Sequence, residues 1–352
     1  MNHYCTYFDR GFLIQGLALW RSLAAHDRDA VLWVLALDDF TTEALREVGG
    51  TWLRVVPLAE LEAGDAALAA AKANRTRLEY FFTLSPCWPR WLLAKRPEID
   101  RVTYLDADLF FFGSPAPVFE EMDHANASVL VTEHRFPAAL RHYEQHGKFN
   151  VGLLSFRNDD AGRACLDDWR ARCLAWCHDR LEDGKYADQK YLDAWPALLG
   201  SALLVLAHAG VNFAPWNWAR HRYAISDHGC EEVDGRPLVC FHFARFAPLG
   251  GGRWWRSGQL DYGVMPPRLR NALYGVYHRA LLAACADIAA RRAGFDFPKK
   301  SARSAREFWR SLPARALFGG DWLLLGGKFF NLRAGFGRWS GRALARARKL
   351  RT

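Results

Sequence analysis

Short apolar runs and helical stretches alternate along the first half of the chain, and this alternation limits the folds that it can adopt. The apolar runs are rich in aliphatic and aromatic residues, as buried strands are, and they cover 3–8, 31–37, 51–56 and 102–105. Apolar side chains at helical spacing cover 12–25, 41–48, 59–73 and 88–95. Such repeats predict an α/β fold whose sheet is mixed but mostly parallel, with helices on both faces.

The rest of the chain changes character twice. Further strands are expected at 128–132, 149–156, 203–207 and 238–243, and a long helix at 161–181. From 251 to 298 the pattern is mostly helical. Residues 299–352 carry fourteen Lys or Arg and two acidic residues, a net charge of +12, whereas the other residues together carry −3. We therefore expect a core domain at 1–250, a helical extension at 251–298 and a basic, aromatic, amphipathic tail at 299–352.

Two aspartates one residue apart, Asp106 and Asp108, follow the apolar strand at 102–105. Because side chains alternate along a strand, both carboxylates should point one way and Ala107 the other. Paired carboxylates beside an apolar element repel each other and lose solvation, unless a divalent cation such as Mg²⁺ or Mn²⁺ binds them. A solvated pair at a turn is the alternative. Further aspartates follow other predicted strands, namely Asp9, Asp38 and Asp39. Parallel sheets bind ligands at the carboxyl ends of their strands, so these positions favour a binding site.

The cysteines and the N-terminus bear on the compartment. Eight cysteines are scattered without a C-x-x-C pair, and no apolar run reaches the length of a membrane-spanning helix. Cys173, Cys177 and His178 lie close in sequence, but no second ligand pair has the spacing of a zinc site, so we expect buried thiols. The first residues lack the basic region and apolar core of a signal peptide. These features predict a cytoplasmic protein.

Five features follow one another along the chain at wide spacing. They are a strand that ends at Asp9, then Asp106-Ala107-Asp108, Phe149-Asn150-Val151-Gly152, Asp188-Gln189 and Phe241-His242-Phe243. In this order and spacing, residues 1–250 resemble the family 8 glycosyltransferases and their bacterial relatives, which adopt the GT-A fold of nucleotide-sugar transferases. The resemblance implies a metal-dependent hexosyltransferase that uses a nucleoside-diphosphate sugar, by expectation a UDP-sugar. It would glycosylate a glycan or lipid-linked acceptor with retention of the anomeric configuration.

The resemblance also implies a metal site. Asp106, Asp108 and His242 would hold Mn²⁺ or Mg²⁺, which bridges the diphosphate of the donor and neutralises the charge on the departing nucleotide. Taken alone, a histidine between two phenylalanines would more often be structural than a metal ligand.

The resemblance places the donor nucleotide and its sugar as well. Thr6, Tyr7 and Asp9 match the segment that contacts the base, although an aspartate at a strand end is equally typical of a helix cap. Asn150 and Gly152 match the segment beneath the donor sugar, where an amide can hold a hydroxyl group. A turn or bulge is the competing interpretation of the glycine.

Asp188 and Gln189 match the pair beside the anomeric carbon of the donor. A carboxylate there can bind sugar hydroxyls, and an amide oxygen can stabilise positive charge on the sugar ring. Whether either residue is a covalent nucleophile stays open, and an inverting transferase with Asp188 as general base is a further possibility. An N-terminal helix cap is the alternative for Asp188.

Two departures from the family pattern concern basic residues. In place of a Gly and a Lys-Pro-Trp that grip the diphosphate, the chain offers Arg245 and Arg253, whose guanidinium groups suit phosphate. The family's basic residue upstream of the metal motif has no clear match. Lys72, Arg75 and Arg77 are the candidates, and a solvated face is the other interpretation of these three.

Two aromatic segments suggest partners. Residues 208–218 are dense in Trp and Asn, and we interpret them as part of an acceptor site, with core packing as the alternative for one tryptophan. The tail at 299–352 predicts contact with an anionic membrane surface, hence peripheral attachment at the inner face of the cell membrane. Nucleic acid is not an expected partner. The rival to the enzyme hypothesis is a non-catalytic carbohydrate- or nucleic-acid-binding protein.

Overall fold

The computed structural model describes residues 1–248, 254–256, 259–263, 265–297, 322–325 and 328–331. The chain divides into two compact units, Met1–His242 and Phe243–Thr352. Of the tail predicted at 299–352, only 322–325 and 328–331 belong to the described residues. The prediction of an amphipathic, membrane-binding tail therefore lies outside the described residues.

A seven-stranded sheet in the order β3-β2-β1-β4-β7-β6-β8 forms the centre of the first unit. Its strands in chain order are β1 (Asn2–Phe8), β2 (Ala30–Ala36), β3 (Leu53–Pro57), β4 (Arg101–Leu105), β6 (Val129–Glu133), β7 (Phe149–Arg157) and β8 (Leu203–Val205). All neighbouring pairs are parallel except the two that β7 makes with β4 and β6. The expected α/β class, with a mixed and mostly parallel sheet, is confirmed.

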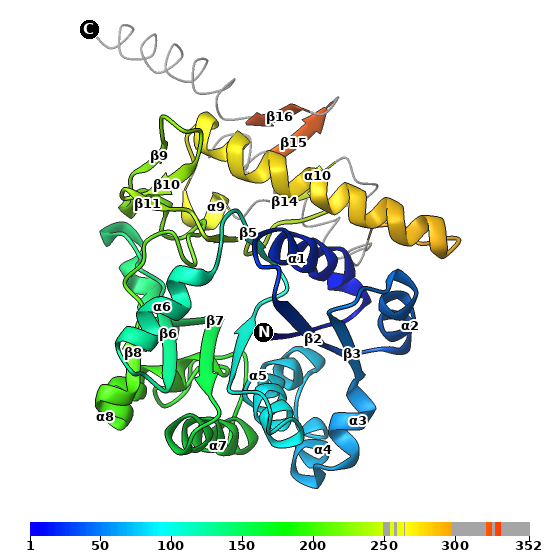
Figure 1. Cartoon of the computed structure of the whole chain (residues 1–352), viewed down its shortest axis with the longest axis vertical. Helices are drawn as coiled ribbons and strands as arrows, with labels where there is room; N and C mark the ends of the chain where they lie inside the picture. The colour runs from blue at the N-terminus through cyan, green and yellow to red at the C-terminus, as the bar shows by residue number, and fades with distance from the viewer. Residues whose placement is uncertain (249–253, 257–258, 264, 298–321, 326–327, 332–352) are drawn as a thin grey trace, which may run out of the picture. The chain divides into compact units, whose positions relative to one another are not determined.

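Helices cover both faces of this sheet, as Figure 1 shows. On one face lie α1 (Leu13–His26) and α2 (Asp39–Val48), and on the other α5 (Arg77–Lys95) and α7 (Asp160–Ala175). The main core fills the space between the sheet and α5 and α7, where Trp88, Tyr104 and Trp169 are buried together. Burial of such large aromatic side chains is a major source of stability, because each removes a wide apolar surface from water.

A small two-stranded sheet joins segments that are far apart in the sequence. Strand β5 (Leu109–Phe111) pairs antiparallel with β12 (Cys240–His242), and His242 lies opposite Leu109. Because β5 follows β4 after a turn of three residues, 106–108, that turn lies beside His242. The remaining elements of this unit are η1 (Arg10–Phe12), α3 (Leu58–Ala63), α4 (Ala66–Lys72), α6 (Ala116–His124), η2 (Ala138–His146), η3 (Gln189–Ala194), α8 (Trp195–Leu199), η4 (Gly200–Ala202), η5 (Trp218–Arg220), β9 (Tyr223–Ile225), β10 (Glu231–Val233) and β11 (Arg236–Pro237).

Three helix boundaries differ from those expected. The helix expected at 88–95 is longer and begins at Arg77, because Thr76 and Glu79 form a capping box. It continues through Pro86 and Pro89. The single helix expected at 59–73 is two, α3 and α4, because Asp65 caps α4 through the Leu68 amide. The helix expected at 161–181 ends at Ala175, and Trp176 is extended.

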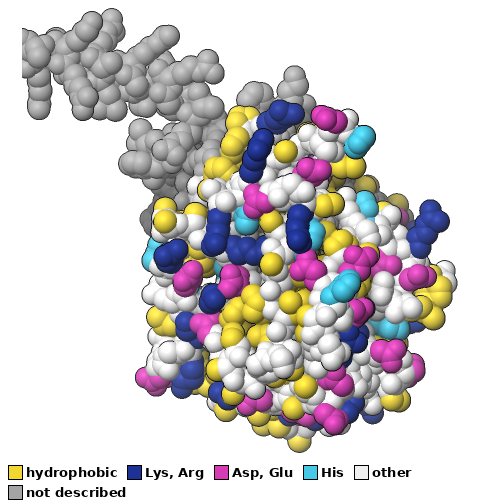
Figure 2. Space-filling view, turned by 60° about the vertical axis from the view of Figure 1, so that its left-hand side comes forward, with side chains coloured by type: hydrophobic (Ala, Val, Ile, Leu, Met, Phe, Trp, Pro, Cys, Tyr) yellow, Lys and Arg dark blue, Asp and Glu magenta, His cyan; other side chains and the backbone are white. Residues whose placement is uncertain are grey.

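Charged side chains of both signs lie interspersed on the face that Figure 2 shows. This mixture agrees with the charge of −3 outside residues 299–352. Among the described residues, no helix has the length and apolar character needed to cross a membrane. Seven of the eight cysteines are buried, as expected, and Cys230 is exposed.

The second unit is described only in part. It contains α9 (Gln259–Tyr262), the long helix α10 (Pro267–Arg291), and four strands in the order β13-β14-β15-β16. These strands are β13 (Ala247–Pro248), β14 (Trp254–Arg256), β15 (Trp322–Leu325) and β16 (Lys328–Asn331). Helix α10 lies within the segment 251–298 for which we expected helix. The last two strands come from the tail, where the sequence predicted none.

Candidate functional site

Asp106, Asp108 and His242 lie together at the ends of β4, β5 and β12. Nε2 of His242 is 3.0 Å from Oδ1 of Asp108 and 3.5 Å from Oδ2 of Asp106. One ligand atom from each residue lies within 4.8 Å of the others. The two carboxylates share a side as expected, but the reason differs: β4 ends at Leu105, so the turn and not the pleat of a strand brings them together.

The orientation of His242 leaves Nε2 available to a ligand. Nδ1 lies 3.1 Å from Oδ1 of Asn212, and an amide oxygen only accepts, so Nδ1 carries the hydrogen. Asn212 is buried, and its amide nitrogen donates to Thr132 Oγ1 and to Asn150 Oδ1, both at 2.9 Å. With this tautomer, the lone pair on Nε2 faces the two carboxylates. Two carboxylate oxygens and one imidazole nitrogen are a suitable donor set for Mn²⁺ or Mg²⁺.

Electrostatics at this cluster reflect the crowding of charges. Burial raises the pKa of Asp106, although the charge of His242 opposes this and the Tyr104 hydroxyl donates to its Oδ1 at 2.8 Å. Burial lowers the pKa of His242, but the Asp108 and Asp106 carboxylates outweigh that effect and raise it overall. The two carboxylates favour a proton on His242. A divalent cation can take the place of that proton, because it satisfies the same negative charges.

Gly152 makes room for His242. A Cβ atom at this position would lie 2.5 Å from Cε1 of His242 and 2.6 Å from Oδ1 of Asn150. The backbone of Gly152 is outside the left-handed region, and its carbonyl accepts from the Asp106 amide at 2.9 Å. The need for space beside His242 explains this glycine, and Gly152 also lies where the register between β6 and β7 shifts, as the bulge considered from the sequence predicts.

A cavity of about 510 Å³ opens beside the three residues. Aromatic side chains that line it include Tyr7, Phe81, Phe82 and Tyr104, and Asp9 is on its wall. Asp9 caps η1 through the Gly11 amide at 2.8 Å and also pairs with Arg77 Nη2 at 2.9 Å. The interpretation of Asp9 as a cap is therefore confirmed, and the same residue lines the cavity. Thr6 is fully buried and is not among the lining residues.

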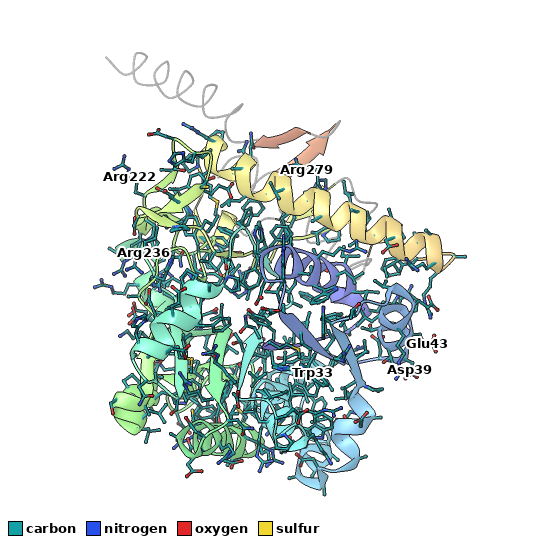
Figure 3. All side chains as sticks on the ribbon, viewed as in Figure 1. Trp33, Asp39, Glu43, Arg222, Arg236 and Arg279 are labelled. Carbon is teal, nitrogen blue, oxygen red and sulfur yellow. The ribbon has the colours of Figure 1, made fainter. Side chains whose placement is uncertain are left out.

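The other strand-end aspartates serve α2. Asp38 caps that helix through the Thr41 amide at 2.7 Å and accepts from the Arg10 amide at 2.8 Å. Asp39 is exposed on α2, and Figure 3 shows it with Glu43 at the edge of the first unit. Neither residue lines the cavity beside Asp106 and Asp108.

Asp188 and Gln189 lie close to the same cluster. Asp188 is 5% exposed, and its side chain makes no capping hydrogen bond to η3, in contrast to the helix cap considered from the sequence. Burial raises its pKa to about 7, the hydrogen bond from Ser85 opposes this, and the charge of Asp106 adds to it. Oε1 of Gln189 lies 3.5 Å from Nδ2 of Asn150. Asn150, whose oxygen accepts from Asn212, therefore lies between Gln189 and His242.

The two arginines predicted to bind the diphosphate follow the first unit in the chain. Arg245 belongs to the second unit, where Nη1 pairs with Asp261 Oδ2 at 2.6 Å. Arg253 lies outside the described residues. Among the candidates for an upstream basic residue, Arg75 donates to Thr83 Oγ1 and to the Leu174 carbonyl, so it is structural.

Residues 208–218 differ in use from the acceptor site that we expected. Asn217 is fully buried, and it and Trp216 both donate to the carbonyl of His134, at 3.1 and 2.9 Å. Asn212 orients His242 in the cluster of two carboxylates and a histidine, as described above. The side-chain amides of Asn212 and Asn217 therefore bond other groups inside the protein. They are not available to bind the hydroxyl groups of a sugar.

Several residues that support the site were not predicted from the sequence. Tyr104 precedes Asp106 by two positions and could have been placed on the same side of β4. Ser85 on α5, His134 and Asn212 gave no signal, because their partners lie far away in the sequence. Burial lowers the pKa of His134 to about 4, and its Nε2 lies 3.2 Å from Nδ2 of Asn150.

Comparison with known proteins gives two relatives and one solved structure of note. The uncharacterized protein YfnF of Bacillus subtilis is 34% identical over 252 residues, which cover 69% of this chain and 81% of YfnF. YfnD of the same organism is 31% identical over 247 residues, covering 69% and 78%. The galactosyltransferase LgtC, solved with donor and acceptor sugar analogues, is 18% identical with a TM-score of 0.45, covering 69% of this chain and 87% of LgtC. No protein-family model matches the chain.

Proposed function

The chain belongs to the same protein family as YfnF and YfnD of Bacillus subtilis, and we propose that it is a metal-dependent glycosyltransferase. In this proposal it has the GT-A type of fold, is related to family 8, and moves a hexose from a nucleoside-diphosphate sugar to a glycan or lipid-linked acceptor. The observation that carries the proposal is the cluster of Asp106, Asp108 and His242 at the wall of an aromatic cavity.

The donor set suits a divalent cation. Asp106, Asp108 and His242 would hold Mn²⁺ or Mg²⁺, which would bind the diphosphate and neutralise the charge that forms as the nucleotide leaves. The chain's own contribution is to orient these ligands. Asn212 fixes the tautomer of His242, and Tyr104 fixes the rotation of the Asp106 carboxylate.

The cavity suits the nucleoside half of the donor. Flat aromatic side chains such as Tyr7 and Phe81 offer stacking surfaces to a base, and stacking accepts any base. Asp9 would select among bases by accepting a hydrogen bond, for example from the imide of uracil. It already pairs with Arg77, whose side chain is 67% exposed, so that ion pair is weak enough to exchange.

The sugar half of the donor would lie toward Asp188 and Gln189. Asn150 contacts Gln189 and, through Asn212, the metal cluster, so one network of amides spans the expected path of the donor. Asp188 would bind sugar hydroxyl groups, and the Gln189 amide oxygen would face positive charge on the ring. Retention of configuration is our expectation, and inversion with Asp188 as general base is the alternative.

Two further assignments complete the proposal. Arg245 and Arg253 remain the candidates for the cation that grips the diphosphate. The charge of +12 on residues 299–352 supports attachment to an anionic membrane surface, where each basic residue contributes about 1 kcal/mol. Flotation of the full chain with vesicles that contain an anionic lipid would show this attachment, and flotation with neutral vesicles would not.

Turnover of nucleotide sugars tests the proposal. With Mn²⁺, the chain should release a nucleoside diphosphate from one member of a panel of nucleotide sugars, at a rate that an acceptor increases. EDTA, Asp106→Ala and Asp108→Ala should each abolish this release, whereas Asp39→Ala on α2 should not. Full release in EDTA would exclude the proposed role of the metal. The proton coupling at the anomeric position of the product, measured by NMR, distinguishes retention from inversion.

A further inference from the structure

The side-chain amide of Asn150 on β7 is buried and has hydrogen-bond partners for both its oxygen and its nitrogen. Its Oδ1 accepts from the Gly152 amide at 3.0 Å and from Asn212 Nδ2 at 2.9 Å. Its Nδ2 lies 3.2 Å from Nε2 of His134 and donates to Oε1 of Gln189 at 3.5 Å. An amide group offers two hydrogens and two lone pairs, so these four contacts use its full capacity. Asn150 therefore bonds other groups of the protein, and the hydroxyl group of a sugar would have to displace one of them.

Two backbone groups fix the direction of these hydrogen bonds. The Gly152 amide can only donate, so the atom of Asn150 that faces it is the oxygen, and the nitrogen faces His134. Nε2 of His134 must then be an acceptor without a hydrogen. This agrees with Nδ1 of the same ring, which lies 3.2 Å from the Lys148 carbonyl and carries the hydrogen. Burial lowers the pKa of His134 to about 4, so the ring stays neutral near pH 7.

The same direction continues to His242. Because Asn150 presents its oxygen, Asn212 presents its nitrogen to it, and the oxygen of Asn212 then faces Nδ1 of His242 at 3.1 Å. Thr132 Oγ1 accepts the second hydrogen of the Asn212 amide at 2.9 Å. Nδ1 of His242 thus keeps a hydrogen, and Nε2 is the nitrogen that faces the carboxylates, 3.0 Å from Asp108 Oδ1.

The backbone of Asn212 is held in an uncommon conformation. Its φ of 55° lies in the left-handed region, which asparagine tolerates better than most residues. The Asn212 amide donates to Sγ of Cys240 at 3.4 Å, and its carbonyl accepts from Asn217 Nδ2 at 3.1 Å. Cys240 begins β12, the strand that ends at His242. Asn212 is therefore tied to the strand that carries the histidine, and such strained residues persist where their surroundings hold them.

We propose that Asn150 is a positioning residue that, with His134 and Asn212, holds the imidazole ring of His242 so that Nε2 faces the cation site. The proposal rests on the proposed function, in which two aspartates and His242 hold a divalent cation. The family resemblance places Asn150 beneath the donor sugar, where its amide would hold a hydroxyl group. A residue with only that task would affect the donor, whereas a positioning residue affects the cation before any donor is bound.

Binding of Mn²⁺ alone to the full chain, measured by calorimetry without a donor, tests the proposal. Asn150→Leu keeps the approximate size of the side chain and removes its four hydrogen bonds, so Asn212 and the His242 ring are held less firmly. We expect the affinity for Mn²⁺ to fall about tenfold. Ser155→Ala is the matched control, because it removes a buried hydroxyl group, 3.0 Å from Thr103 Oγ1, from the same strand. It should leave the affinity unchanged.

A second pair of variants tests the part of His134. His134→Leu removes the acceptor of the Asn150 amide and should lower the affinity for Mn²⁺ about threefold. His134→Gln places an amide oxygen near the position of Nε2 and should restore most of the affinity. Equal affinity for Mn²⁺ in the wild type, Asn150→Leu and His134→Leu would overturn the proposal.

The ¹⁵N NMR spectrum of the metal-free chain, labelled at histidine, gives a readout that depends on neither metal nor turnover. The wild type should carry a hydrogen on Nδ1 of His134 and none on Nε2. The Nδ1 hydrogen of His242 should exchange with solvent about tenfold faster in Asn150→Leu than in the wild type. His134→Gln and His242→Gln identify the resonances. An exchange rate that does not respond to Asn150→Leu, or a hydrogen on Nε2 of His134, would overturn the proposal. If no Mn²⁺ binds to the wild type, the proposed function fails, and the NMR spectrum still decides whether Asn150 positions His242.

Discussion

The geometry of the proposed metal site depends on two small residues as well as on its three candidate ligands. Asp106 and Asp108 flank Ala107, which is buried, and His242 packs against Gly152 on β7. A larger side chain at 152 would occupy the place of the imidazole ring. The requirement at this position is therefore for space, and any side chain should disturb the ligand that lies against it.

Gly152→Ala tests this requirement. The added methyl group would lie 2.5 Å from Cε1 of His242, so the imidazole ring must shift from the position in which it faces the two carboxylates. We expect a loss of about 1–3 kcal/mol in the free energy of unfolding and weaker binding of Mn²⁺, measured by urea unfolding and calorimetry. Gly64→Ala is the matched control, because no atom lies within 4 Å of its added methyl group. Unchanged Mn²⁺ affinity in Gly152→Ala would contradict the account.

Some residues of the candidate site could be predicted from the sequence and others could not. The grouping of Asp106, Asp108 and His242 was predictable because their order and spacing resemble a known family, whereas each residue taken alone has a common structural use. Asn212 and Ser85 were not, because serine and asparagine are common and only the folded chain shows what they touch. The interpretation of 208–218 failed for the same reason: burial, which sequence does not show, decides whether an amide binds a ligand or the protein.

The first turn of α5 ties the cavity to the segment that leads to Asp188. Glu79 accepts from Thr76 as part of the capping box, and its Oε1 accepts from the Asp179 amide at 3.0 Å and lies 3.2 Å from Nδ1 of His178. The side chains of Arg77 and Phe81 from the same turns line the cavity. One carboxylate thus holds a wall of the cavity and the approach to Asp188 together.

Glu79→Gln should loosen this connection. Burial opposes ionisation of Glu79, but the bonds from Thr76 and Asp179 outweigh it and lower its pKa to about 2. Because the folded pKa is below the unfolded one, Glu79 stabilises the fold above pH 4.5, and this stabilisation is lost as the pH falls from 4.5 toward 2. We expect Glu79→Gln to cost about 1 kcal/mol at pH 7 and less at pH 3, by urea unfolding. Exposed Glu60→Gln on α3 is the control, and an equal cost at both pH values would contradict this account.

The order of helices and strands was more predictable than their ends. The alternation of apolar runs and amphipathic stretches predicted the mostly parallel sheet. Strands and helices could be told apart because apolar residues recur at a different spacing in each. The predicted start of α5 was too late in the sequence, because Pro86 and Pro89 are typical of helix breaks. In the structure, burial of Tyr80, Leu84 and Trp88 outweighs the cost of these two prolines. The antiparallel pairing of β7 was not visible, because it depends on which strands become neighbours.

The candidate site and the excess of positive charge lie in different parts of the chain. The cluster of Asp106, Asp108 and His242 and the cavity beside it lie within Met1–His242, and the excess of positive charge lies in residues 299–352. The family shared with YfnF and YfnD covers 69% of the chain. We expect the first part to recognise the donor and the basic tail to set where the enzyme works.

Binding of nucleoside diphosphates tests the central claim most directly. Calorimetry with UDP, GDP, ADP and CDP should show that one of them binds the wild-type chain in Mn²⁺ and that EDTA abolishes this binding. The double variant Asp106→Asn/Asp108→Asn should lose it, and the matched control Asp39→Asn, on the exposed face of α2, should keep it. Binding of the same strength in EDTA or in the double variant, or no binding of any of the four in Mn²⁺, would contradict the account.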